Sequence, residues 1–111
     1  MSERIDRDFK GHLIVSESCE WFRTTDVAGH RISSIGEYRQ PGTPGFTEIG
    51  WGRKYETMVF PLGERVCGCG CAAPEVSSWS EVDSDGYNSR KAAEAGHERM
   101  VAKYLAAEVT K

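Results

Sequence analysis

The clearest pattern of hydrophobic and polar positions lies near the C-terminus, over residues 89–108. Hydrophobic side chains, with one histidine among them, recur there every three or four residues, which is the spacing of one face of an α-helix. The members of this stripe are Ala93, His97, Met100, Val101, Tyr104 and Leu105. Asn88 or Ser89 can cap the first turn. Gly96 costs a helix about 1 kcal/mol relative to alanine, which predicts that the helix backbone approaches a sheet closely at this residue.

Residues 11–39 have the composition of a β-hairpin. Leu13, Val15 and Trp21 supply β-forming side chains to the first strand, and residues 31–38 form the second. Between the strands, residues 24–29 include an aspartate and a glycine, which favour a turn.

Residues 54–71 predict a second hairpin. The β-forming run 55–60 is followed by Pro61 and Gly63, which suit a turn, and the chain returns over residues 64–69. Because side chains alternate along a strand, Met58 and Phe60 share one face. We expect that face to meet the helix.

The segments between these elements are polar or rich in glycine and proline. Residues 1–10 read as a solvated arm of alternating charge, and residues 72–87 as a polar connection. Residues 40–52 contain two Pro-Gly steps and predict a long loop. The sequence therefore predicts one α+β domain over residues 11–111, in which two antiparallel β-hairpins form one small sheet with the C-terminal helix packed on it.

Composition narrows the classes of protein that fit. The chain has 111 residues, a formal net charge of -3 and 39% hydrophobic residues, which suit one globular domain. A basic strip of Arg23, Arg31, Arg39, Arg53 and Lys54, with aromatic residues between them, would suit nucleic acid, but glutamates dilute it. The start of the chain lacks the apolar segment of a signal peptide, and no apolar run is long enough to cross a membrane.

Three large apolar residues lie in the predicted 40–52 loop: Phe46, Ile49 and Trp51. They either fold back over the sheet or form a contact patch for a partner, as exposed aromatic residues often do.

Cys67, Cys69 and Cys71 alternate with glycines, so their thiols would project from one face of an extended strand. Such a set could bind zinc, with a further ligand from His97 or from His12, His30 or Cys19. The alternative is that the cysteines are small packing residues beneath a close helix. His97 itself is expected to be a hydrogen-bonded core histidine rather than a metal ligand or a proton-transfer group.

No nucleophile elbow, phosphate-binding loop or metalloprotease motif is present in the sequence, which argues against an enzyme. Residues 53–105 resemble a set of small uncharacterised proteins of actinobacteriophages and related prophages. The matching features are the strand 55–60, the cysteine-glycine stretch 67–71, the pair Tyr87 and Asn88, residues 94–97, and Met100 with Val101.

The resemblance implies a phage-encoded product that acts in the bacterial cytoplasm or in the virion. With the loop aromatics and the missing catalytic motifs, it leads us to expect a non-catalytic accessory protein that binds a host or viral protein. Two alternatives stay open: a virion component that assembles with copies of itself, and a small zinc-stabilised binding module.

Overall fold

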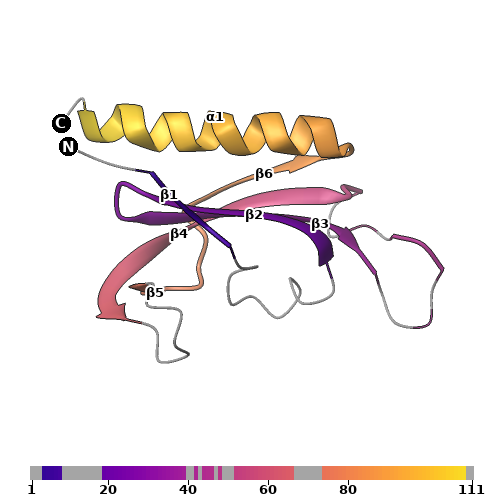
Figure 1. Cartoon of the computed structure of the whole chain (residues 1–111), viewed down its shortest axis with the longest axis horizontal. Helices are drawn as coiled ribbons and strands as arrows, with labels where there is room; N and C mark the ends of the chain where they lie inside the picture. The colour runs from indigo at the N-terminus through magenta and orange to yellow at the C-terminus, as the bar shows by residue number, and fades with distance from the viewer. Residues whose placement is uncertain are drawn as a thin grey trace.

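The computed structural model describes residues 4–8, 19–39, 42, 44–46, 48, 52–66 and 74–109. Within them, an antiparallel sheet is covered on one face by the C-terminal helix α1, Arg90–Val109 (Figure 1). The predicted α+β class is therefore confirmed. The strands are β1 (Ile5–Arg7), β2 (Cys19–Val27), β3 (His30–Tyr38), β4 (Tyr55–Val66), β5 (Pro74–Val76) and β6 (Asp83–Tyr87).

The sheet follows the order β1-β2-β3-β4, after which β5 and β6 pair with different parts of β4. Tyr55 to Val59 of β4 pair with β6, whereas Leu62 and Val66 pair with β5. Because β4 bends along its length, the sheet curls into a half-barrel (Figure 1).

The first predicted hairpin consists of β2 and β3, but its turn is shorter than predicted. Thr24 to Val27 belong to the strand, and the turn is confined to Ala28 and Gly29, whose φ angles are 52° and 72°. Two successive positive φ values define a type I′ turn, whose twist matches that of the flanking strands. Residues 11–18, assigned to the same hairpin, lie outside the described residues.

The predicted turn at Pro61 and Gly63 is wrong, because β4 runs through both residues. Pro61 is the last β4 residue paired with β3, and it falls between the ladder to β6 and the ladder to β5. A proline is tolerated at such an interruption because its missing N–H breaks no ladder hydrogen bond. Its carbonyl accepts a hydrogen bond from the Ser77 N–H at 2.9 Å.

Two segments predicted to be irregular contribute edge strands. β5 and β6 lie within the predicted polar connection, and β1 lies within the predicted arm. All three are short, and β6 has the sequence DSDGY, which has little intrinsic preference for a strand. Pairing with the edges of β2 and β4 orders them, which the local sequence could not indicate.

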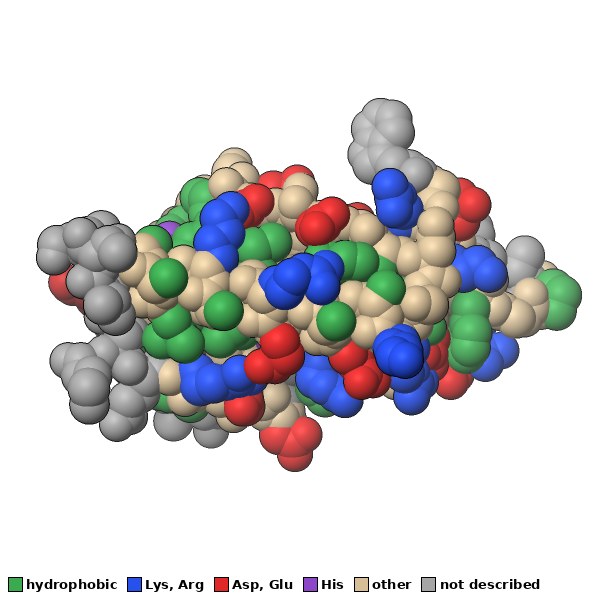
Figure 2. All heavy atoms as spheres, turned by 90° about the horizontal axis from the view of Figure 1, so that it is seen from above, with side chains coloured by type: hydrophobic (Ala, Val, Ile, Leu, Met, Phe, Trp, Pro, Cys, Tyr) green, Lys and Arg blue, Asp and Glu red, His purple; other side chains and the backbone are tan. Residues whose placement is uncertain are grey.

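The helix agrees closely with its prediction. The Ser89 hydroxyl accepts a hydrogen bond from the Ala92 N–H at 3.1 Å, and the Ser89 carbonyl accepts one from the Ala93 N–H. Met100 and Val101 pack against Val27, Ile32 and Val59 in the core between helix and sheet. Viewed from above, the outer face of α1 carries basic and acidic side chains with small apolar ones between them (Figure 2).

The face of β4 that meets the helix is the opposite of the predicted one. Tyr55 and Val59 belong to the two hydrophobic clusters beneath α1, with the buried Thr57 between them. Phe60 packs instead against Trp79, with ring centroids 5.2 Å apart. The sequence suggested the wrong face because Met58 and Phe60 are large apolar residues. The face that lies beneath the helix instead includes a layer of polar side chains.

Candidate functional site

A chain of buried polar side chains joins the helix to four strands. His97 of α1 lies between Ser34 of β3, 2.7 Å from Nδ1, and Thr25 of β2, 2.9 Å from Nε2. Ser34 continues to the Thr57 hydroxyl at 2.6 Å, and Thr25 donates to Asp6 of β1 at 2.7 Å. His97, Ser34, Thr25 and Thr57 are all at most 1% exposed.

The chemistry of these groups assigns a direction to every hydrogen bond. The pKa of Asp6 is lowered, first by hydrogen bonding to Arg4 and then to Thr25, so Asp6 is a carboxylate that only accepts. Thr25 gives its one proton to Asp6 and must accept from Nε2–H of His97. Nδ1 of the neutral ring then accepts from Ser34, and Ser34 accepts from Thr57.

Burial keeps the imidazole neutral. It lowers the pKa of His97 from 6.5 to about 4, against the attraction of Glu98 and Asp6, which raises it. Near neutral pH, His97 is therefore a hydrogen-bonding group that links α1 to the sheet.

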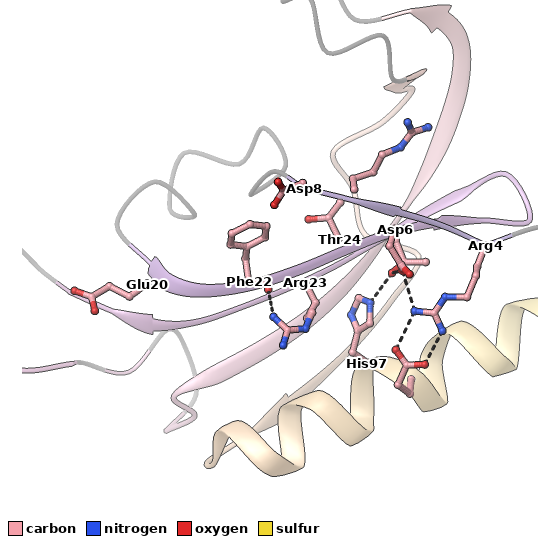
Figure 3. Close-up of a pocket in the computed structure, with 11 residues that line it drawn as sticks. Arg4, Asp6, Asp8, Glu20, Phe22, Arg23, Thr24 and His97 are labelled. Atoms are coloured by element: carbon pink, nitrogen blue, oxygen red, sulfur yellow. Dashed lines mark hydrogen bonds and ion pairs between the residues drawn. The ribbon is translucent and has the colours of Figure 1, made fainter.

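The network reaches the surface through Arg4 and Asp6, beside an open cavity of about 520 Å³ (Figure 3). The Arg4 guanidinium donates to Asp6 at 2.8 Å and to both oxygens of Glu98 at 2.6 and 2.9 Å. Phe22 and Arg23 also line the cavity. Its charged floor is thus largely neutralised by internal ion pairs that fasten β1 to α1.

Serine, histidine and aspartate also form catalytic triads, but this arrangement differs in two ways. Thr25 stands between His97 and Asp6, and Ser34 is buried. A nucleophile must reach its substrate, so Ser34 is not placed for attack in this structure. Its hydrogen bonds hold the helix in position.

On the opposite face of the sheet, a buried ion pair joins β2 and β3. Arg31 donates to both oxygens of Asp26, at 2.8 and 3.0 Å, and to the Pro74 carbonyl at 3.1 Å. Arg7 of β1 adds a hydrogen bond to Asp26 at 3.0 Å. Both members of the central pair are at most 5% exposed, so this cluster ties β1 and β5 to the middle of the sheet.

A third polar cluster lies at the end of the sheet where α1 begins. Glu37 accepts hydrogen bonds from the Tyr55 hydroxyl at 3.0 Å and from the Arg90 guanidinium at 2.6 Å. Its φ angle is 57°, a left-handed conformation that is uncommon for a side chain of this kind. The buried carboxylate fastens the ends of β3, β4 and α1 together.

The predicted contact residues in the 40–52 loop are only partly described. Phe46 is 43% exposed, and the Arg39 guanidinium carbon lies 4.8 Å from its ring centroid. Ile49 and Trp51 lie outside the described residues. The contact patch of Phe46, Ile49 and Trp51 therefore stays a prediction.

The predicted metal ligands are not brought together among the described residues, which contain no cluster of three potential ligands. Both ring nitrogens of His97 are hydrogen bonded, as expected for a core histidine. Nδ1 of His30 lies 2.7 Å from the Ala28 carbonyl, and Cys19 is buried. Cys67, Cys69, Cys71 and His12 lie outside the described residues, so a zinc site stays a prediction.

The basic strip considered from sequence is not one continuous surface. Arg31 is buried against Asp26, and Trp21 is buried beneath the helix. The polar network was not identified from sequence either, because Thr25, Ser34 and Thr57 meet only once the register of three strands is known. The one indication in the sequence was that these polar residues occupy the same strand face as apolar residues two positions away.

Comparison of the chain with protein-family models, curated proteins and solved structures gave no match. In the described part of the chain, no helix is long and apolar enough to span a membrane.

Proposed function

We propose that this protein is a non-catalytic accessory protein that binds another protein through the end of the sheet carrying the 40–52 loop. The observation that supports this most directly is the exposed ring of Phe46 beside the guanidinium of Arg39. Aromatic and arginine side chains contribute a disproportionate share of binding energy at protein interfaces.

The surroundings of Phe46 suit a docking site because they are held by the sheet. Arg39 donates to Glu20 at 3.0 Å, which orients the guanidinium between β2 and the loop. Next to this pair, Glu37 joins β3 to Tyr55 and Arg90. A side chain oriented in this way, as Arg39 is, loses less conformational entropy on binding.

The chemistry of the interior supports binding rather than catalysis. The serine, threonines and histidine of the network bind one another beneath the helix. The resemblance of residues 53–105 to actinobacteriophage proteins suggests the partner's source: a host or viral protein, met in the bacterial cytoplasm or in the virion.

The test is affinity capture from an actinobacterial lysate with wild-type protein and a Phe46→Ala variant, quantified by mass spectrometry. Trp79→Ala is the matched control, because Trp79 is a similarly exposed aromatic residue that packs on Phe60. We expect Phe46→Ala to lose a captured protein that Trp79→Ala retains, with a melting temperature close to wild type. Equal capture by both variants, or a large fall in the melting temperature of Phe46→Ala, would contradict the proposal.

A further inference from the structure

Resting on the proposed function, we infer that the partner presents an acidic protein segment to a basic patch beside Phe46. This basic patch consists of Arg53, Lys54 and Lys91. It lies where α1 begins.

Arg53 and Lys54 contact the end of β6 and the residue after it, and Lys91 follows that segment in the first turn of α1. The Arg53 side chain lies against Gly86, where an added β carbon would be 2.9 Å from its Cγ. The Lys54 N–H donates to the Tyr87 carbonyl and the Asn88 side chain, both at 3.2 Å. Lys91 is the second residue of the helix.

The same end of the sheet carries Phe46. Gly36 near the end of β3 pairs with Tyr55 at the start of β4, and Tyr55 pairs with Tyr87 at the end of β6. The Arg39 and Phe46 contact therefore lies at the end of the sheet where the basic patch is found. A partner docked on Phe46 would meet both.

The basic patch is not neutralised within the described part of the chain. Other cations at this end have carboxylate partners, in the pairs Arg39 with Glu20, Arg23 with Glu94, and Arg90 with Glu37. No described carboxylate forms an ion pair with Arg53, Lys54 or Lys91.

Two carboxylates nearby only partly offset the basic patch. Glu48 lies in the loop itself, and Glu56 follows Tyr55 in β4. Glu56 lies on the face of the sheet away from the helix, and burial raises its pKa, with a further contribution from Glu81.

The position of Lys91 is not explained by helix stability. Acidic side chains are favoured in the first turn because they complement the positive end of the helix dipole, yet α1 has no acidic residue there and begins with Arg90 and Lys91. The whole chain has a formal charge of -3. A basic patch on an acidic protein would steer an acidic partner toward one end of the molecule.

A protein segment fits this surface better than a single-stranded nucleic acid. Nucleic-acid surfaces of that kind interleave cations with aromatic rings that stack on bases. Trp21, whose ring centroid lies 5.4 Å from the Arg23 guanidinium carbon, is buried against Tyr55 and Ala93. Among the described residues at this end, the exposed ring is Phe46, which suits an anchor for a protein.

The experiment measures binding of labelled oligoglutamate, oligolysine and single-stranded DNA to the full-length protein at low salt. The variant is Lys54→Glu and the matched control is Arg65→Glu, an exposed residue near the other end of β4 with the same change of charge. We expect oligoglutamate to bind, with affinity weakened about threefold to tenfold by Lys54→Glu, less than about twofold by Arg65→Glu, and further by added salt.

Equal effects of the two variants, tighter binding of oligolysine, or Lys54-dependent binding of DNA that exceeds oligoglutamate binding would each overturn the inference. The proposed function is judged separately. If Phe46→Ala loses the captured protein and Lys54→Glu keeps it, partner binding stands and the acidic character of the partner is wrong.

Discussion

Gly96 of α1 lies directly against the ring of Tyr87 in β6: an added β carbon would be 2.1 Å from the phenolic oxygen and from Cζ. The ring cannot move freely, because its hydroxyl donates to Asp85 at 3.0 Å and Arg99 lies over its face. The helix therefore reaches its packing distance at this point only because residue 96 has no side chain.

Gly96→Ala is expected to destabilise the protein by about 1–3 kcal/mol, since the clash outweighs the gain of about 1 kcal/mol in helix propensity. Urea unfolding would measure this. In a Tyr87→Ala background the clash is absent, so the same substitution should stabilise the protein by up to about 1 kcal/mol. Destabilisation of equal size in both backgrounds would show that the Tyr87 contact is not the cause.

Stability is expected to fall as the pH decreases from 6.5 to about 4, because the folded-state pKa of His97 is about 4 against 6.5 for the ordinary side chain. In that window the unfolded chain binds a proton on His97 and the folded chain does not. The loss is about 1.4 kcal/mol per pH unit, or about 3 kcal/mol in all.

The measurement is the free energy of unfolding of wild type and His97→Gln at several pH values between about 7 and 4.5. The difference between the two free energies of unfolding isolates the contribution of His97, because the carboxylates titrate in both proteins. Asp6, Glu98 and Asp83 have lowered pKa values, held down by Arg4 or Lys103, so their contributions are lost at more acidic pH. Parallel curves for the two proteins would contradict a buried neutral His97.

The assigned direction of the network predicts unequal effects at its two hydroxyls. Ser34→Ala leaves Nδ1 of buried His97 and the Thr57 hydroxyl without their partner, at a cost of about 2–3 kcal/mol. Thr57→Val removes a donor whose acceptor, Ser34, still donates to His97, and should cost about 1 kcal/mol.

Long-range ¹H–¹⁵N spectra test the same assignment directly. We expect His97 to carry its proton on Nε2 at neutral pH, with Nδ1 unprotonated. A proton on Nδ1 would reverse the assigned order of Thr57, Ser34 and His97.

The helix could be predicted in detail because its information is local. Ser89 caps it, its apolar stripe has helical spacing, and Gly96 interrupts the stripe where β6 crosses. The positions of short strands could not be predicted, because β5 and β6 owe their order to the unpaired edge of β4 rather than to their own composition. The turn predicted at Pro61 was wrong for the same reason. The sheet tolerates this proline because it lies in the gap between the β6 and β5 ladders, which the local sequence does not indicate.

In the candidate site too, the residues that could be predicted are those whose signal lies in the local sequence. Phe46 is proposed as a contact residue because a large aromatic residue in a loop rich in glycine and proline is conspicuous in the sequence itself. The proposed basic patch is only partly visible in the sequence: Arg53 and Lys54 are adjacent there, whereas Lys91 belongs to the helix that follows β6. Asp6 was assigned to a solvated arm, although pairing of β1 with β2 places it beside Thr25.

Asp26 provides the last prediction, because it accepts from Arg31 and Arg7 on the face away from the helix. Asp26→Ala leaves the charge of Arg31 buried without its carboxylate, and the expected cost is about 3–5 kcal/mol. Glu20→Ala, which breaks the exposed pair with Arg39, should cost about 0–1 kcal/mol. Urea unfolding of both variants compares the pairs, and similar losses would mean that Arg31 finds water or another acceptor when Asp26 is removed.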